Sequence, residues 1–180
     1  MVYAIVSVDK NWGIGYRGKL LAYIPEDMRF FKEKTTNNVV IMGRKTYESL
    51  SIRPLPHRIN IVITSKIDKP CVIEDNTMFV TMDFIKMFLS TLSPNNPINY
   101  YIIGGGQIYK ELLPFCDTAY VTKLDHAYGD VDTYFPNLDK IENWEEWYVS
   151  DSGYDGYQAV DYKFCIYKKK VEQEWLNKCL

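Results

Sequence analysis

One acidic residue, Asp27, lies in a strongly apolar stretch of the sequence. Met28, Phe30 and Phe31 follow it closely, and Phe31 shares its face in a helix because the two residues are four positions apart. A carboxylate beside a hydrophobic wall has a raised pKa and favours a cationic or hydrogen-bond-donating ligand. The alternative is a solvent-facing carboxylate that stabilises the positive end of a helix. Asp27 is therefore the candidate acid of a binding or catalytic site.

Cations and hydroxyls gather at two places where an apolar run ends. The first is GRKT at residues 43–46, after the run at 38–42, and the second is TSK at residues 64–66, after the run at 58–63. Helix N-termini offer free N–H groups to anions, and arginine adds a fork that matches phosphate. Each cluster alone is also typical of a solvated surface turn. Together they favour a ligand with more than one phosphate group.

Three consecutive glycines at residues 104–106 follow another apolar run, at 99–103. The spacing is not that of the GxGxxG dinucleotide motif, because residue 109 is Tyr109. A backbone without Cβ atoms can approach a flat ligand or a phosphate closely, and it can equally form a tight turn. The glycines therefore indicate either a ligand contact or a structural turn.

Short apolar runs alternating with helical stretches are expected to position these residues. We predict buried strands at residues 3–8, 38–42, 58–63, 99–103 and 119–124, and weaker ones at 71–74 and 78–80. Helices are predicted from Pro25 onward, over 43–50, from a Thr81 cap to about residue 92, and over 107–113. Between the first strand and Pro25, glycines at positions 13, 15 and 18 predict a loop that runs to about Ile24.

Near the C-terminus, residues 147–150 and 158–167 are predicted to be antiparallel partners. In the second segment apolar residues alternate with Asp161, Lys163 and Cys165, which we expect on a wet face. Residues 168–180 are compatible with a helix. The whole pattern predicts an α/β fold in a single domain: a mostly parallel central β-sheet with an antiparallel C-terminal edge strand, flanked by about four helices. Ligands of such sheets bind beyond the carboxyl ends of the strands, where the candidate residues gather.

Composition narrows the class of protein. The 180 residues carry a net charge of −2, which gives no basic excess for nucleic acid, and no apolar run reaches the roughly 18 residues that span a bilayer. The four cysteines form no CxxC pair, and two histidines supply neither a metal site nor a Ser/His/Asp triad. The N-terminal residues lack the pattern of a signal peptide. We therefore expect a cytoplasmic protein with no metal, nucleic-acid or membrane partner.

Several segments, in order and spacing, resemble the dihydrofolate reductase family. They are residues 5–8 (IVSV), 11–15 (NWGIG), 24–31 (IPEDMRFF), 40–46 (VIMGRKT), 53–60 (RPLPHRIN), 102–106 (IIGGG) and 132–136 (DTYFP). The resemblance covers residues 2 to about 168. It implies a dihydrofolate reductase-like fold for residues 1–168 and leaves 169–180 as a C-terminal tail.

The resemblance implies reduction of 7,8-dihydrofolate to 5,6,7,8-tetrahydrofolate with NADPH, by hydride transfer to C6 and protonation at N5, in support of one-carbon metabolism. Asp27 matches the family's buried carboxylate, which binds the 2-amino group and N3 side of the pterin. Its charge stabilises the pterin protonated at N5, and the proton arrives through water. Leu20, on a mobile loop of residues 15–22, and Tyr109 complete the expected catalytic centre.

The other implied substrate contacts wall the pterin and benzoyl ring, hold the glutamate tail or support the acid. Arg58 would bind the α-carboxylate in a bidentate pair, and Thr122 would support Asp27. Main-chain carbonyls of Ile5 and Ile103 would bind the pterin amino group. The full set is Ile5, Val6, Asp27, Met28, Phe31, Leu50, Leu55, Arg58, Ile103 and Thr122.

The implied cofactor contacts fall on the two cationic clusters and the glycines. Residues 44–46 would meet the phosphates, 64–65 the 2′-phosphate end and 105–108 the pyrophosphate, while Ser7 and Ile14 would flank the nicotinamide. The full set is Ser7, Ile14, Gly15, Gly43, Arg44, Lys45, Thr46, Thr64, Ser65, Lys66, Ile103, Gly105, Gly106, Gln107, Ile108 and Tyr109. The resemblance further implies a monomer that binds antifolate inhibitors.

The sequence departs from the family at one place. After Leu20 the family usually shows Pro-Trp, whose indole orders a water near the acid, whereas this chain has Leu21-Ala22 followed by Tyr23. The Tyr23 hydroxyl is one candidate to hold that water; otherwise the water is held more loosely. The proton path and the affinity for inhibitors are the properties that this change puts in question.

Two other functions fit the same general pattern. One is the NADPH-dependent pyrimidine reductase of riboflavin synthesis, whose ribose-phosphate substrate has no need of Asp27 and Arg58. The other is a non-catalytic nucleotide-binding or scaffold protein that kept the fold, which would bind NADPH without reducing folate.

Overall fold

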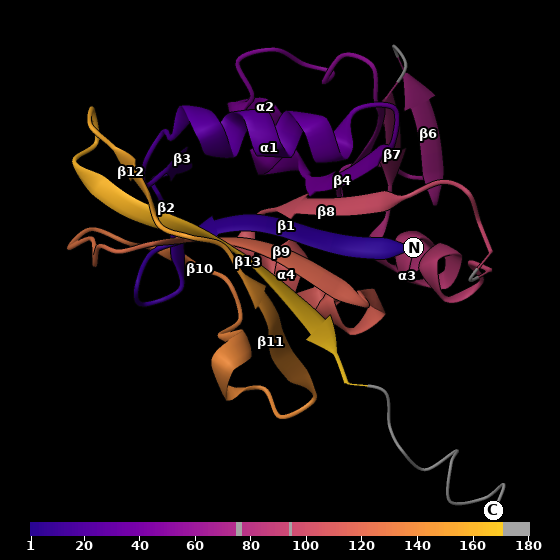
Figure 1. The fold of residues 1–180 in the computed structure, drawn as a ribbon. Helices are drawn as coiled ribbons and strands as arrows, with labels where there is room; N and C mark the ends of the chain where they lie inside the picture. The colour runs from indigo at the N-terminus through magenta and orange to yellow at the C-terminus, as the bar shows by residue number, and fades with distance from the viewer. Residues whose placement is uncertain (75–76, 94, 171–180) are drawn as a thin grey trace, which may run out of the picture.

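A mixed β-sheet runs through the molecule and separates two layers of helices (Figure 1). This computed structural model describes residues 1–74, 77–93 and 95–170. Within them the main sheet has ten strands, in the order β11-β13-β9-β1-β8-β4-β5-β7-β6, with β12 paired to β13.

Six strands form the parallel centre of the sheet. They are β1 (Val2–Val8), β4 (Val39–Gly43), β5 (Ile59–Ile63), β7 (Thr77–Val80), β8 (Tyr100–Gly104) and β9 (Thr118–Leu124). Their sequences are rich in Val, Ile and Tyr, the residues that fill a sheet covered on both faces. The predicted parallel centre is thereby confirmed.

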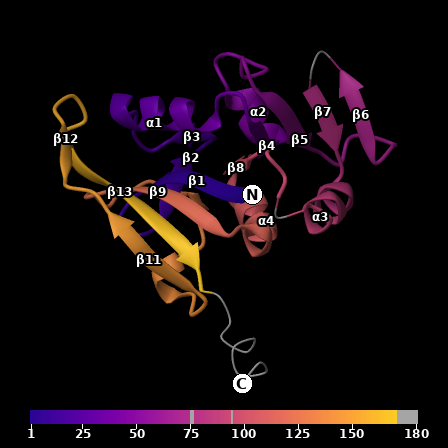
Figure 2. The same ribbon diagram turned by 45° about the vertical axis from the view of Figure 1, so that its right-hand side comes forward.

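Antiparallel strands close the sheet at both ends (Figure 2). At one end β13 (Val160–Lys169) pairs with β9, β11 (Trp144–Val149) and β12 (Gly153–Asp155). At the other end β6 (Cys71–Glu74) pairs with β7. The antiparallel part is therefore larger than the predicted C-terminal edge strand.

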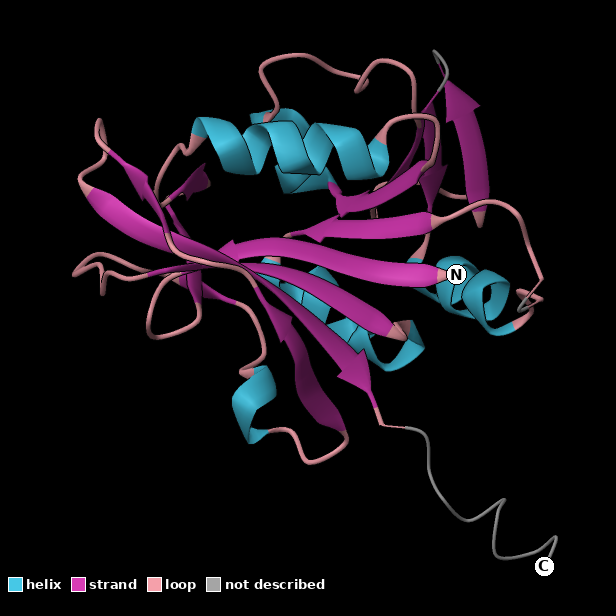
Figure 3. Ribbon diagram, in the orientation of Figure 1, coloured by secondary structure: helices cyan, strands magenta, loops and turns pink. Residues whose placement is uncertain are grey.

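Helices cover both faces of the sheet (Figure 3). On one face, α1 (Pro25–Thr35) and α2 (Arg44–Ser49) pack on a cluster that includes Ile5, Val40 and Met42. On the other face, α3 (Met82–Ser90) and α4 (Gly106–Leu112) pack on the larger core, with the short turns η1 (Leu113–Phe115) and η2 (Leu138–Lys140). The Thr81 side chain caps α3 as predicted, by accepting a hydrogen bond from the N–H of Phe84.

The predicted loop from Gly13 to Ile24 contains strands, so that prediction was wrong in part. β2 (Gly13–Tyr16) pairs with β3 (Lys19–Leu20) and with β10 (Thr133–Tyr134) in a small three-stranded sheet. β10 lies more than a hundred residues further along the chain, so no local pattern in 13–24 could reveal this pairing.

The predicted wet face of β13 was wrong at Cys165. Its side chain is buried in the larger core together with Tyr167, while Asp161 and Lys163 are exposed as expected. At the start of the strand the buried side chains are those of Val160 and Tyr162, on one face of the sheet. Further along, the buried side chains are those of Cys165 and Tyr167, on the opposite face. Cys71, Cys116 and Cys165 form no disulfide in the described part of the chain.

β13 continues through Lys169, so residues 168 and 169 are strand and not helix. Lys170 is irregular, with its N–H donating to the Asn143 oxygen, and residues 171–180 of the predicted helical tail lie outside the described residues.

Candidate functional site

The carboxyl ends of the parallel strands bring the predicted site segments to one edge of the sheet. Because β4 pairs with both β5 and β8, the segments after Gly43, Ile63 and Gly104 leave the sheet side by side. Ser7, near the end of β1, pairs with Thr122 on β9. The sheet therefore joins the two cationic clusters, the glycines and Thr122 in a single region, as the strand-end rule predicts.

Asp27 lies in the first turn of α1 and is almost wholly buried, with 9% of its surface exposed. The helix begins at Pro25, whose missing N–H has no intrahelical partner to lose. The Thr122 hydroxyl donates a hydrogen bond of 2.6 Å to Oδ1 of Asp27. Burial raises the pKa of Asp27 above its ordinary value, and the Thr122 hydrogen bond opposes that rise. The prediction of an acid in apolar surroundings is confirmed.

An apolar wall lies on the same face of the sheet. Phe31 of α1 packs in the cluster of Ile5, with the half-buried side chains of Leu50, Leu55 and Ile103. Val6 is different, because its side chain joins the larger core on the other face. Only the main chain of Val6 is therefore open to a ligand beside Asp27, as the alternation of side chains along a strand requires.

Arg58 is held in place by two hydrogen bonds. Its Nε donates to Oγ1 of Thr35 at 2.8 Å, and one terminal nitrogen donates to the main-chain oxygen of Pro56 at 2.7 Å. The guanidinium carbon lies 5.8 Å from the centre of the Phe31 ring. Partial burial lowers the pKa of Arg58 from its ordinary value. This arginine is thus a positioned cation beside the apolar wall, unlike a freely solvated surface charge.

Two residues that support this arrangement were missed from the sequence. Thr35 is fully buried on α1, where its hydroxyl donates to the Phe31 oxygen at 2.7 Å and accepts from Arg58. Asn60 is buried inside β5, and its amide joins the N–H and oxygen of Leu55 and the oxygen of Arg58. The polar Asn60 within the apolar run RINIVI was the available signal.

Tyr109 connects the glycine turn to the first strand. It is buried on α4, and its hydroxyl donates a 2.7 Å hydrogen bond to the main-chain oxygen of Ile5. Burial is the main cause of its raised pKa, and the negative charge of Asp27 adds to the rise. Gly104 has φ +122, and a Cβ placed there would lie 3.3 Å from the Tyr109 ring. The hydroxyl proton of Tyr109 is therefore committed to the Ile5 oxygen, and the Tyr109 ring packs against the backbone at Gly104.

The GRKT segment and the glycine turn lie against each other. A Cβ placed on Gly105 would be 3.4 Å from Oγ1 of Thr46, and one on Gly43 would be 2.9 Å from Cγ1 of Ile108. The N-terminus of α2, with Arg44 and the exposed Lys45, opens beside this contact. Arg44 pairs with Glu48 one turn along the helix at 2.5 Å. A ligand phosphate would compete for Arg44 with this exposed ion pair, which costs little to break.

The second cluster follows β5. Thr64 is buried, and its Oγ1 accepts a hydrogen bond of 3.1 Å from the N–H of Lys66. Ser65 and Lys66 are exposed. This turn presents the Ser65 hydroxyl and the Lys66 ammonium to solvent, a set that suits a phosphate.

The segment predicted to cover the reacting rings is anchored at one end and exposed at the other. Ile14 and Gly15 are buried in β2, whereas Leu20 on β3 is 59% exposed. Residue Asp132 ties this segment to β10, because its carboxylate accepts from the Arg17 N–H at 2.7 Å and its own N–H donates to the Gly15 oxygen. A cavity of about 540 Å³ lies between Leu20 and residues 128–130.

Asp9, which sequence reasoning did not single out, organises the entry to this segment. It is 2% exposed, and its Oδ1 accepts hydrogen bonds from the N–H groups of Asn11 at 2.8 Å and Gly13 at 2.7 Å. Its Oδ2 accepts from the N–H of Tyr128 at 3.1 Å. An acidic residue followed by a Gly-containing turn was the only signal.

Ala22 and Tyr23 stand where the family has its indole. Ala22 packs against a small cluster that contains Ile24, Leu124 and Tyr162. The Tyr23 side chain is 62% exposed. The role of Tyr23 in holding a water stays a prediction.

Comparisons with known proteins agree with this geometry. The family model described as Dihydrofolate reductase matches residues 1–169. The chain is 35% identical over 173 residues to the dihydrofolate reductase of Bacillus subtilis, covering 94% of this chain and 95% of that protein. It is 34% identical over 170 residues to that of Haemophilus influenzae, covering 92% and 97%.

Among solved structures, the chain is similar to a dihydrofolate reductase from Enterococcus faecalis complexed with NADP(H) and RAB-propyl. The TM-score is 0.79 at 31% identity, over 95% of this chain and 97% of the other. The family model covers every residue of the site described above. The chain therefore belongs to the dihydrofolate reductase family.

Proposed function

We propose that this protein is an NADPH-dependent reductase that converts 7,8-dihydrofolate to 5,6,7,8-tetrahydrofolate and so supplies one-carbon metabolism. The observation that carries the proposal is the buried carboxylate of Asp27, held by Thr122 on the face of the sheet that Phe31 and Leu50 cover. A buried acid needs a partner with donors or positive charge. The 2-amino group and N3–H of a pterin supply the donors, and protonation at N5 supplies the charge.

The edge of the sheet fits NADPH. Because Gly105 has no Cβ, the glycine turn approaches the start of α2 closely, and the side-chain hydroxyl of Thr46 lies beside it. A pyrophosphate can therefore lie against main-chain N–H groups and the Thr46 hydroxyl. Arg44 and Lys45 add positive charge there. Ser65 and Lys66, on the neighbouring strand end, suit the 2′-phosphate. When bound, NADPH supplies the hydride that reduces C6.

The remaining work falls to side chains and main-chain oxygens of this chain. Asp27 accepts hydrogen bonds from the pterin, and its charge stabilises the form that is protonated at N5. Main-chain oxygens of Ile5 and Ile103 accept from the pterin amino group. Arg58 binds the tail carboxylate with the nitrogens that Thr35 and Pro56 leave available. Leu20 and its strand exclude water from the reacting rings.

Other properties stay predictions. We infer a cytoplasmic monomer that binds antifolates, and a reductase domain of residues 1–168 followed by a tail. No helix in residues 1–74, 77–93 or 95–170 has the length and apolar character needed to cross a membrane.

The test is the fall in NADPH absorbance when dihydrofolate is added to the purified protein, with Asp27→Asn as control. Rapid oxidation by the wild type alone supports the reaction and the role of the acid together. Oxidation only with the ribose-phosphate pyrimidine of riboflavin synthesis would replace this proposal with that pathway's reductase. Bound NADPH with no oxidation in either assay would leave a non-catalytic nucleotide-binding protein.

A further inference from the structure

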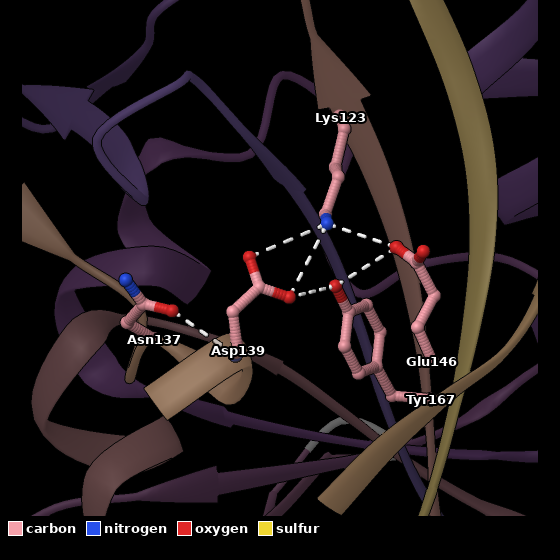
Figure 4. A network of polar contacts seen from close by, with 5 residues as sticks. All are labelled: Lys123, Asn137, Asp139, Glu146 and Tyr167. Carbon is pink, nitrogen blue, oxygen red and sulfur yellow. Dashed lines mark hydrogen bonds and ion pairs between the residues drawn. The ribbon is translucent and has the colours of Figure 1, made fainter. Parts of the chain in front are cut away.

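A cluster of polar and charged side chains gathers around Lys123 (Figure 4). Side chains alternate along β9 and Thr122 faces Asp27, so Lys123 lies on the opposite face of the sheet, outside the proposed reaction site. The Lys123 ammonium on β9 lies 2.9 Å from Oε1 of Glu146 on β11 and 3.4 Å from Oδ1 of Asp139 on η2. The Tyr167 hydroxyl on β13 lies 2.5 Å from the same Asp139 oxygen and 3.0 Å from Glu146 Oε1. We call these four residues the Lys123 cluster. Asn137 fixes the start of η2 by accepting from the N–H of Asp139 at 3.0 Å.

Lys123 is the residue on which the cluster depends. The Tyr167 hydroxyl has one proton, so it can donate to only one of the two carboxylates at a time. The ammonium of Lys123 has three protons and reaches both carboxylates. Burial acts to lower the pKa of Lys123, but hydrogen bonding and attraction from Glu146 and Asp139 outweigh burial and raise it. Without Lys123, two carboxylates would face each other across a single phenol.

Two members of the Lys123 cluster, Lys123 and Tyr167, lie against the indole of Trp12. The ammonium lies 5.5 Å from the centre of the Trp12 ring, and the Tyr167 ring meets the indole edge-on at 5.9 Å between centres. Trp12 is 5% exposed and has φ +63, a left-handed backbone conformation that a bulky side chain rarely adopts. Such a conformation persists only where the surroundings hold it. The contacts to Lys123 and Tyr167 are part of what holds it.

Trp12 is connected to the proposed reaction site in two ways. It directly precedes Gly13 and Ile14 of β2, so its backbone sets where the nicotinamide-flanking segment begins. Its main-chain oxygen also accepts a 2.9 Å hydrogen bond from the N–H of Phe135, and the two rings stack 6.1 Å apart. Phe135 in turn meets the Tyr109 ring edge-on at 4.7 Å, and Tyr109 holds the Ile5 oxygen.

We propose that the Lys123 cluster positions Trp12 and, through it, the Ile14 segment and the Tyr109–Ile5 contact. Lys123 and Tyr167 are positioning residues, because they touch neither substrate nor cofactor. The second half of the inference rests on the proposed function, since it assigns an effect on hydride transfer. The first half, the hold on Trp12, is a property of the unliganded protein.

Lys163 provides a matched control. It is the cross-strand partner of Lys123 on β13, and both lysines line the same cavity of about 520 Å³. Among the described residues, the side chain of Lys163 has no hydrogen-bond or ion-pair partner, whereas that of Lys123 has both. Replacing either lysine with methionine therefore removes one charge from the same cavity, but only Lys123→Met disrupts the cluster. Lys123→Arg keeps a charge that can reach both carboxylates.

The first measurement is the indole N–H resonance of Trp12 in the unliganded protein, assigned with Trp12→Phe. Lys123→Met should shift or broaden this resonance, Tyr167→Phe should do so less, and Lys163→Met should leave it in place. The second is the single-turnover hydride-transfer rate per active site, with active sites counted by titration with a tight-binding antifolate. Lys123→Met should lower this rate by about two- to thirty-fold, and Lys123→Arg should restore most of it.

Three results would overturn the inference. One is a Trp12 resonance that responds equally to both lysine substitutions. Another is a lower melting temperature and fewer active sites in Lys123→Met with an unchanged rate per site. That result would mean that Lys123 stabilises the fold without positioning the reaction site. The third is a moved Trp12 resonance with an unchanged rate. If the wild type itself gave no turnover, the proposed function would fail, and the Trp12 resonance would still decide the first half.

Discussion

The hydroxyl of Thr122 reaches from β9 to α1 and donates a 2.6 Å hydrogen bond to Oδ1 of Asp27, across 95 positions of sequence. Burial raises the pKa of the acid and this hydrogen bond lowers it, so the pair sets how much of the acid is ionised. The balance matters because the proposed substrate contact uses the ionised form.

Thr122→Val is expected to shift the acid limb of the kcat/KM profile to higher pH. Loss of the hydrogen bond removes the interaction that lowers the Asp27 pKa, so a larger fraction of the acid is protonated at a given pH. The measurement is the pH profile with dihydrofolate, beside Thr118→Val on the same strand as control. Superimposed profiles for all three proteins would remove Thr122 from control of the acid.

Asp27→Asn should lower turnover near neutral pH by about 10²- to 10⁴-fold, the range that a positioned acid or base typically contributes. The substituted amide keeps the size of the side chain but not the charge that stabilises the protonated pterin. The dissociation constant of NADPH should stay close to the wild-type value, because Asp27 lies on α1 whereas the proposed cofactor contacts follow the ends of β4, β5 and β8. Near wild-type turnover would exclude Asp27 from the mechanism.

The same substitution should change the pH dependence of stability. Below the pKa that Asp27 has in the unfolded chain, the side chain is protonated in both the folded and the unfolded state, so its ionisation does not affect stability. As pH rises through the raised folded pKa, ionising the buried carboxylate destabilises the fold, so the wild type loses stability that Asp27→Asn keeps. The melting-temperature difference, variant minus wild type, should grow as pH rises above about 4, the ordinary pKa of an aspartate, and should level off once the folded state is also ionised. A constant difference across that range would contradict a raised pKa.

Arg58→Leu should raise the KM for dihydrofolate by about ten- to a hundred-fold, since a hydrogen-bonded charge pair with the tail carboxylate is lost. A dihydropterin that lacks the aminobenzoyl-glutamate tail should be reduced equally by variant and wild type. Arg53→Leu is the control, because Arg53 is exposed and donates to the Glu48 oxygen instead. An unchanged KM in Arg58→Leu would make Arg58 a surface charge.

Ala22→Trp should alter the turnover rate or its pH dependence by supplying the indole that orders a water in the family. The new side chain would have to fit beside Ile24, Leu124 and Tyr162, which pack around Ala22. Stopped-flow rates across pH for the two proteins are the measurement. Indistinguishable rates at every pH would show that this chain handles the proton without that position.

Much of the fold follows from local pattern. Runs such as 58–63 are apolar enough to predict a covered strand, and Pro25 and Thr81 mark helix starts that the structure has at those places. Asp27 was found for a similar reason, because its apolar neighbours lie within one helical turn. Predictions of this kind need only residues that are close in sequence.

What could not be predicted depends on distant residues. The hydrogen bond from Arg17 to Asp132 joins residues 115 positions apart, and the pairing of β2 with β10 joins the same two distant segments. Cys165 is buried because β13 contacts one core at its start and the core on the opposite face further along. The alternation of apolar and polar residues in the sequence does not show this change. Asp9 looks like an ordinary turn acid until the N–H of Tyr128 is placed beside it.

Asn60 binds the Leu55 and Arg58 segment through main-chain atoms alone. The shape of that loop therefore does not depend on which side chains occupy the positions between its two ends. The exposed side chain of Pro56 can therefore change while Leu55 and Arg58 keep their places. Position 57 is more restricted, because the φ of +57 at His57 favours residues that accept a left-handed backbone. Mutational tolerance should accordingly be high at Pro56 and low at the buried amide beneath the loop.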